Sequence, residues 1–236
     1  MLRVLTSTLR FPRPWRPLET RRCSSNAGAA DREIQVCALA GPDQGIAEIL
    51  MNRPSARNAL GNVFVSQLLE ALAQLREDRQ VRVLIFRSGV KGVFCAASSA
   101  VMGLIETTRG LLPGAGGTQR LPRCLGVALA KELIFTGRRL SGAQAQALGL
   151  VNHAVAQNEE GNAAYHRARA LAQEILPQAP IAVRLSKVAI DRGIEVDIAS
   201  GMAIEGICYA QNIPTRDRLE GMAAFREKRL PRFVGE

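Results

Sequence analysis

A single carboxylate, Glu106, stands in an apolar stretch of the sequence near Met102, Leu104 and Leu111. A carboxyl group buried among such side chains favours its neutral form, which can donate a proton. These residues therefore suggest a general acid or base. The alternative is a glutamate at the end of a strand that caps the backbone of the following loop. The residue types around Glu106, taken alone, favour this second interpretation.

A loop rich in glycine and proline, GLLPGAGGTQRLPR at 110–123, follows the glutamate and is expected to interrupt regular structure. It lacks the Lys-Ser/Thr ending of a P-loop and the G-x-G-x-x-G spacing of a dinucleotide site. We therefore predict no phosphate-binding loop of either type here. The simplest role for Gly116 and Gly117 is to let the loop turn into a helix.

Metal-binding and nucleophilic residues are sparse. The five cysteines form no C-x-x-C pair, and His153 and His166 are the only histidines. The sequence thus supports neither a zinc site nor a disulfide framework. It also has no recognisable Ser-His-Asp arrangement, so we assign no metal ligand and no role to either histidine.

Half of the net charge of +10 lies in the first 30 residues, where six arginines stand against Glu19 alone. This segment is also rich in serine and threonine and has no long apolar stretch, which is typical of a mitochondrial transit peptide. A disordered basic leader is the alternative. No apolar run reaches the roughly 18 residues that a membrane span requires, so we expect no such span.

The elements that would position Glu106 begin with a short strand at 46–51, which Pro54 prevents from continuing. Apolar residues then recur every three or four positions over 62–75, as on one face of an amphipathic helix. The run VRVLIF at 81–86 is typical of a strand covered on both faces. The order strand, helix, strand predicts a parallel βαβ unit.

Beyond the glycine-rich loop, GVALAKELIFTG predicts a helix that ends at Gly137. Ser141 and Gln144 form a capping-box pattern for a second, short helix, and 150–155 is expected to be a strand. The remainder is helical almost throughout. The helices are predicted at 163–176, 180–192, 195–210 and 215–229.

Four phrases of the sequence, taken together and in order, resemble the enoyl-CoA hydratase/isomerase (crotonase) family. They are NRPSARNAL at 52–60, GLLPGAGGTQRLPR at 110–123, the run at 136–155, and FREKRLPRF at 225–233. The resemblance extends from Ile34 to the C-terminus. It implies an α/β fold, a crotonase-like ββα spiral followed by a C-terminal helical oligomerisation region that packs in trimers or hexamers.

On this basis the chain divides into a leader at 1–30, a truncated crotonase-like ββα core at 31–156 and a C-terminal helical region at 157–236. The family's spiral carries a Gly-Ala-Asp turn and a Gly-Gly-Gly segment, whose backbone N–H groups stabilise an enolate, and a first catalytic glutamate. None of these is found between Ala96 and Ser98. The resemblance therefore implies that several tens of residues from the centre of the spiral are missing.

The resemblance also implies which residues form the site. Glu106 matches the family's second catalytic glutamate, which serves as acid or base. The implied ligand is an acyl-CoA thioester, and no cofactor is implied because CoA is part of the substrate. The substrate-binding positions that match are Ala56, Arg57, Ala96, Gly114, Phe225 and Lys228.

Two functions from different classes follow from this resemblance. The first is hydration of 2-enoyl-CoA in fatty-acid or branched-chain acyl-CoA metabolism in the mitochondrial matrix, impaired by loss of the enolate-stabilising segments. The second is a non-catalytic subunit that mixes into oligomers of the full-length form.

RNA binding is a third possibility, because one mitochondrial relative recognises RNA through a lysine-rich helix. The matching helix here carries Arg76 against Glu70, Glu77 and Asp78. It therefore offers no basic stripe, and we predict no nucleic-acid partner.

Overall fold

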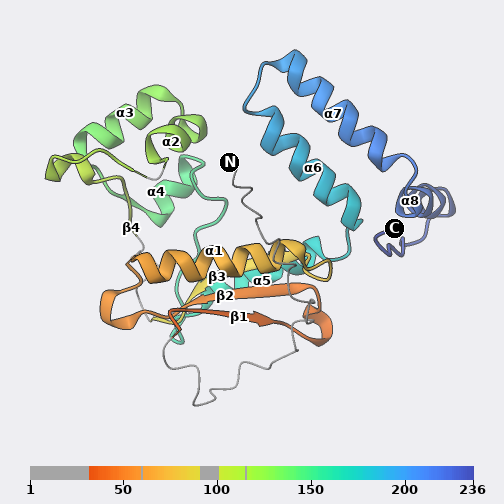
Figure 1. Cartoon of the computed structure of the whole chain (residues 1–236), viewed down its shortest axis with the longest axis horizontal. Helices are drawn as coiled ribbons and strands as arrows, with labels where there is room; N and C mark the ends of the chain where they lie inside the picture. The colour runs from red at the N-terminus through yellow and green to blue at the C-terminus, as the bar shows by residue number, and fades with distance from the viewer. Residues whose placement is uncertain (1–31, 60, 91–100, 115) are drawn as a thin grey trace, which may run out of the picture.

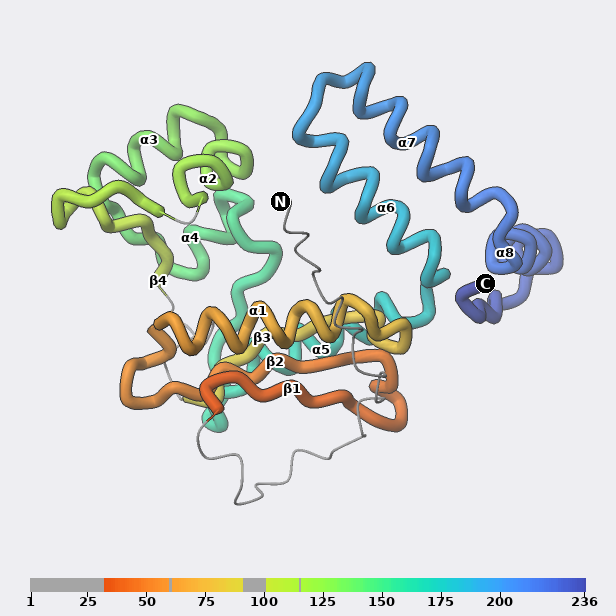
Figure 2. The backbone as a smooth tube through the Cα atoms, viewed as in Figure 1, coloured from red at the N-terminus to blue at the C-terminus, as the bar shows by residue number. Residues whose placement is uncertain are grey.

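A computed structural model describes residues 32–59, 61–90, 101–114 and 116–236. It has three parts, which Figure 1 shows as a layered sheet with a helical lobe and a helical arm standing above it on opposite sides. The backbone tube in Figure 2 follows the same arrangement.

The sheet has three strands in the order β1-β2-β3, with β1 antiparallel to β2 and β2 parallel to β3. The helix α1 connects the two parallel strands, so the predicted parallel βαβ unit is confirmed. The bounds are β1 (Ile34–Ala38), β2 (Ile46–Met51), α1 (Asn62–Glu77) and β3 (Val83–Ser88).

Helices cover both faces of this sheet. On one face α1 buries Phe64 against Ile49, both of which have no exposed surface. On the other face α5 (Ala163–Ile175) packs Ala172 against Ile46 and Ile85. Burial on both faces explains why β2 is apolar at every position except Glu48. We call these three strands and two helices the sheet unit.

The second part, here called the glutamate lobe, contains the described residues from 101 to 151. Its short strands β4 and β5 pair antiparallel, and its core is formed by Leu133, Leu140 and Ala145. Its elements are β4 (Val101–Met102), the 3-10 helix η3 (Glu106–Arg109), α2 (Gly117–Leu125), α3 (Val127–Thr136), β5 (Leu140–Ser141) and α4 (Gly142–Ala147).

Two predictions for this lobe are confirmed and two are wrong. Gly137 ends α3 in the left-handed conformation, and Ser141 caps α4 in a complete capping box with Gln144. The expected irregular loop instead becomes helical from Gly117, with Pro122 inside α2, because Leu121 and Leu125 of this turn pack on the lobe's core. Residues 150–155 form no strand, since Leu150 and Val151 pack on the same core without a neighbouring strand.

The third part, the C-terminal arm, consists of α6 (Pro180–Gly193), α7 (Ile198–Asn212) and α8 (Arg216–Glu227). The four predicted C-terminal helices, including α5, are confirmed to within three residues at each end. Helices α6 and α7 lie side by side, and Gly193 and Gly201 face each other where they meet, with room for a Cβ on Gly193 at an ordinary contact distance of 3.7 Å from the Cα of Gly201.

The helices and cysteines can be compared with what the composition predicted. Among the described residues, no helix has the length and apolar character needed to cross a bilayer. Cys37 in β1 is disulfide-bonded, although the sequence supported no disulfide framework, whereas Cys124 and Cys208 are free thiols.

Candidate functional site

Glu106 begins η3, and three residues separate it from the end of β4. Its Oε2 atom is buried and has no hydrogen-bond partner within the described residues. A buried polar oxygen without a partner is rare in folded proteins and calls for a functional or structural explanation. The alternative role proposed from sequence, a side-chain cap of the following loop, has no support, because Leu111 N donates to the backbone oxygen of Glu106 instead, at 3.0 Å.

The turn that holds this carboxylate is fixed by hydroxyl groups. Thr107 Oγ1 donates to the carbonyl oxygen of Ile134 in α3 at 2.6 Å, and Thr108 Oγ1 donates to that of Ile105 at 2.7 Å. Gly110 ends η3 with a φ of 69°, a conformation that favours glycine. The position of Glu106 is thus set by hydrogen bonds of its neighbours rather than of its own side chain.

Gly114 lies in the same lobe, on the loop between η3 and α2. It is exposed, and nothing lies within 4 Å of where a Cβ would be. Its carbonyl oxygen accepts a hydrogen bond from Gly117 N at 3.1 Å. Gly117 in turn packs on Leu104, which would lie 3.0 Å from an added Cβ. The structure therefore brings the glycine-rich loop next to the segment that leads into Glu106.

Ala56 and Arg57 lie where β2 ends, in and just after the 3-10 helix η2 (Pro54–Ala56). Arg57 is exposed, has a φ of 48°, and makes no ion pair within the described part of the chain. In Figure 1 the η2 loop lies at the end of the sheet where α1 begins, on the side of the molecule from which β4 rises into the glutamate lobe.

Phe225 and Lys228 contact each other at the end of α8. Lys228 Nζ lies 4.7 Å from the centre of the Phe225 ring, in a cation–π arrangement. Figure 1 places α8 at the opposite side of the molecule from the glutamate lobe. Within one chain, the structure does not bring this pair together with Glu106. Ala96 lies outside the described residues.

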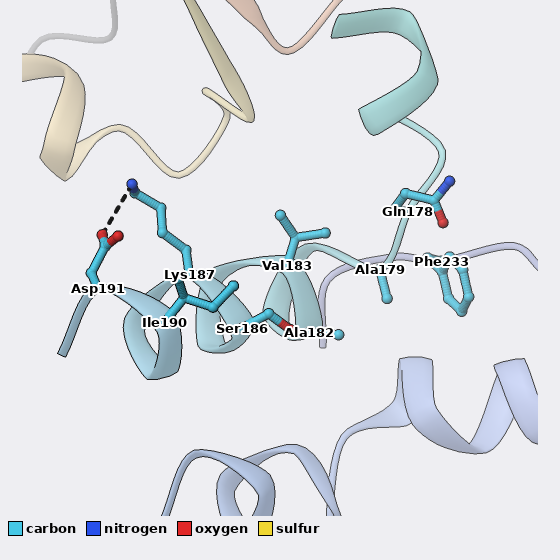
Figure 3. Close-up of a pocket in the computed structure, with 9 residues that line it drawn as sticks. All are labelled: Gln178, Ala179, Ala182, Val183, Ser186, Lys187, Ile190, Asp191 and Phe233. Carbon is cyan, nitrogen blue, oxygen red and sulfur yellow. Dashed lines mark ion pairs between the residues drawn. The ribbon is translucent and has the colours of Figure 1, made fainter. Parts of the chain in front are cut away.

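A cavity next to the arm does not coincide with these residues. It measures about 580 Å³ and is lined by α6 together with Phe233, as Figure 3 shows. Lys187 and Asp191 form an ion pair of 3.1 Å at one end of it. Its walls offer no buried acid or base, so we place the candidate site at Glu106 rather than in this cavity. No cluster of three or more metal-ligating side chains occurs among the described residues.

Sequence reasoning missed a buried polar network between the sheet and α5. Glu48, which is 2% exposed, accepts hydrogen bonds from Arg87 Nε at 2.8 Å and from the Tyr165 hydroxyl at 2.6 Å. Burial of the Tyr165 hydroxyl, together with its bond to Glu48, raises the pKa of that tyrosine to about 12. The signal in the sequence was an acid at the centre of an otherwise apolar strand.

A second buried acid lies close by. Asp43, in the 3-10 helix η1 (Gly41–Asp43), pairs with Arg169 and accepts a 2.7 Å hydrogen bond from Gln173 Nε2. The hydrogen bond from Arg169 lowers the pKa of Asp43, against the opposing effect of burial. Both acids are bonded to side chains of α5.

The geometry thus defines an α/β protein in which the partly buried Glu106, whose Oε2 has no partner within the described residues, lies beside an open glycine loop. A family model for enoyl-CoA hydratase/isomerase matches residues 41–98 and 95–236. The chain belongs to this family.

The similar proteins agree with the family match. Mitochondrial enoyl-CoA hydratase domain-containing protein 2 from Bos taurus is 78% identical, and the protein of the same name from Homo sapiens is 68% identical, each over all of both chains. The crystal structure of an enoyl-CoA hydratase from Bacillus anthracis superposes with a TM-score of 0.80 at 33% identity, covering 87% of this chain and 100% of that one. The crotonase fold predicted from sequence is therefore confirmed.

These matches also locate an interruption. The family model matches in two pieces that overlap at residues 95–98. The alignment with the bovine relative extends over 296 positions, 60 more than the 236 residues of this chain. The relative therefore has residues for which this chain has none, as the sequence analysis inferred.

Proposed function

We propose that this chain binds acyl-CoA thioesters in the mitochondrial matrix but hydrates 2-enoyl-CoA far more slowly than complete members of its family. The observation that carries the proposal is the break in the family match at residues 95–98, a few residues before a Glu106 carboxylate with a buried, unpartnered oxygen. No separate cofactor is involved, because CoA belongs to the substrate.

The physical reason lies in the enolate that forms when water adds to an unsaturated thioester. Its negative oxygen needs fixed N–H donors, and each donor that is lost raises the barrier by about 3 kcal/mol. Loss of two donors lowers the rate by a factor on the order of ten thousand. Glu106 alone can exchange a proton with the substrate carbon or with water, but it does not stabilise that oxygen.

Turnover of crotonyl-CoA, followed by the loss of its conjugated enone absorbance, tests the catalytic part of the proposal. With the purified chain we expect a rate at least about a thousandfold below that of the bovine relative assayed in parallel. Glu106→Gln should abolish any residual turnover while leaving the unfolding transition in place. A rate comparable with that of the bovine relative contradicts the proposed impairment.

Calorimetry with CoA tests the binding part separately. We expect saturable binding that weakens as salt rises, because exposed guanidinium groups such as that of Arg57 would pair with phosphate. Arg57→Ala should weaken CoA binding, whereas Arg138→Ala, which removes an exposed arginine of the glutamate lobe, should not. A chain that binds no CoA at all contradicts the proposal as a whole.

A second function, that of a non-catalytic subunit in mixed oligomers, has its own supporting observation. The arm exposes several large apolar side chains, and exposed apolar patches of this kind are typical of protein interfaces. They include Ile190 (69% exposed), Ile194 (70%), Ile198 (82%) and Ile207 (63%).

Co-expression with the tagged bovine relative tests this second function. We expect the two chains to purify together, and Ile198→Glu in this chain to reduce the mixed species, because a charge on the exposed apolar face opposes its burial. Exclusive recovery of unmixed bovine oligomers contradicts it.

A further inference from the structure

The side chain of Asn58 ties the loop that carries Ala56 and Arg57 to the sheet. Its Oδ1 accepts a hydrogen bond from Arg53 N at 2.8 Å, across the base of the loop. Its Nδ2 donates to Ser88 Oγ at 2.8 Å and to the carbonyl oxygen of Met51 at 3.4 Å. Met51 and Ser88 are the last residues of the parallel strands β2 and β3, so Asn58 connects the loop to both strand ends.

The backbone at this point is strained. Arg57 and Asn58 have φ values of 48° and 57°. This region costs a residue such as arginine about 1 kcal/mol or more, and asparagine less. Such a conformation persists only where the surroundings hold it. The side-chain bonds of Asn58 supply that support, and Asn58 N also donates to the carbonyl oxygen of Arg53 at 3.0 Å.

The two arginines of this loop differ in their contacts. Arg53 is fully engaged, with Nε 2.7 Å from a carboxylate oxygen of Glu33 and Nη1 donating to the carbonyl oxygen of Ala59 at 2.7 Å. Arg57 is exposed and has no ion pair within the described part of the chain. The loop thus uses one guanidinium for its own structure and leaves the other available to an anionic ligand.

We infer that Asn58 is a positioning residue that holds the Arg57 guanidinium in place for a phosphate group of CoA. The inference rests on the proposed function and names how one of its contacts is organised. Asparagine suits this position because it tolerates positive φ and offers both an acceptor for Arg53 N–H and a donor for Ser88 and Met51. Aspartate lacks the donor, and glycine lacks both groups.

A double-mutant cycle on CoA affinity tests the inference, with the full chain and calorimetry at several salt concentrations. Asn58→Gly removes the hydrogen bonds of the Asn58 side chain. Because glycine adopts positive φ freely, this substitution adds no backbone strain that could itself change CoA affinity. We expect Arg57→Ala and Asn58→Gly each to weaken CoA binding about tenfold. The double variant should be no weaker than Arg57→Ala alone, because Asn58 acts through Arg57.

The salt dependence of binding separates this role from a purely structural one. Asn58→Gly should reduce the salt dependence of CoA affinity as Arg57→Ala does, since the same charge contact is lost. Additive losses in the cycle, or an unchanged affinity in Asn58→Gly, contradict the role of Asn58 alone. Absence of CoA binding by the unchanged chain contradicts the proposed function itself and the inference with it.

Trypsin cleavage provides a readout that needs no ligand. The Arg57–Asn58 bond should be cut faster in Asn58→Gly, whereas Arg53 is followed by Pro54 and stays resistant in both proteins. Asn158→Gly is the matched control, because Asn158 also accepts a backbone hydrogen bond with its side chain, from Asn162 N at 2.9 Å, in an exposed loop. Equal cleavage at Arg57 in Asn58→Gly and Asn158→Gly contradicts the proposed support of the loop.

Discussion

The sheet unit and the C-terminal arm bury their apolar side chains to very different extents. In the sheet unit, Phe64 and Ile49 have no exposed surface, and both faces of the sheet are covered. In the arm, Leu185 and Cys208 are buried, but Ile198 and Phe225 are 82% and 72% exposed. The sheet unit therefore buries its apolar side chains within itself, whereas the arm leaves apolar surface that a partner could cover.

The largest effect that would test this contrast comes from truncating one phenylalanine in each region. Phe64→Ala should lower the free energy of unfolding by about 4 kcal/mol, because it leaves a cavity in a packed core. Phe225→Ala should lower it by less than about 0.5 kcal/mol, because the ring is already in solvent. Urea titration measures both. Similar losses would mean that α8 is covered in solution and that the contrast does not hold.

The buried ion pair of the sheet unit should give the next largest effect. Arg87→Met leaves the 2% exposed Glu48 without its cation, and we expect a loss of about 2 kcal/mol, moderated by the partial exposure of Arg87. The matched control is Arg138→Met, which breaks an exposed pair with Glu132 and should cost less than about 1 kcal/mol. Equal losses in urea titration would show that Glu48 depends on its arginine no more than the exposed Glu132 does.

Alkaline pH should weaken the sheet unit through Tyr165. The pKa of Tyr165 is raised to about 12 in the folded chain from an ordinary value of 10.0, so the neutral hydroxyl favours folding. This contribution is complete below pH 10 and is lost as pH rises toward 12, by about 2 kcal/mol.

Unfolding followed between pH 9 and pH 12 should therefore show a steeper decline for the unchanged chain than for Tyr165→Phe. Tyr209→Phe in α7 is the control, because Tyr209 is 63% exposed, and it should follow the unchanged chain. Identical slopes for all three proteins would contradict the role given to the buried hydroxyl.

The smallest expected effect is local to the arm. Asp197 caps α7 by accepting hydrogen bonds from Ala199 N and Ser200 N, and Asp197→Ala should destabilise that helix by about 1 kcal/mol. Hydrogen exchange should increase in the first turns of α7 while the protection of β2 stays unchanged. A matching loss of protection in β2 would show that arm and sheet unfold together.

The regular elements were largely predictable because they depend on local patterns. The apolar spacing from residue 62 indicated α1, and the Ser141 and Gln144 pair indicated the start of α4. The role of Gly116 and Gly117 in turning the loop into a helix was anticipated, but the extent of α2 was missed because Pro122 suggests a break when read locally. Only contacts of Leu121 and Leu125 with the lobe's core explain why the helix forms there.

The candidate site was predictable only in part. Glu106 and Gly114 could be selected from the resemblance of short phrases, and the structure brings their segments together. The role of Asn58 could not be inferred, because its partner Ser88 lies 30 positions away in the sequence. That distance is bridged only once β2 and β3 pair in parallel.

By itself, the sequence determined the family, the βαβ unit, the C-terminal helices and the interruption near residue 96, because periodicity, caps and characteristic phrases are properties of neighbouring residues. It did not reveal β1, whose place at the sheet edge depends on pairing with β2. Tertiary structure alone decided which distant groups meet, such as Glu48 with Tyr165, 117 positions apart, and which elements stay apart, such as the glutamate lobe and α8. The physical reason is that a buried charge must find its partners among whatever side chains the packed layers bring within hydrogen-bond distance.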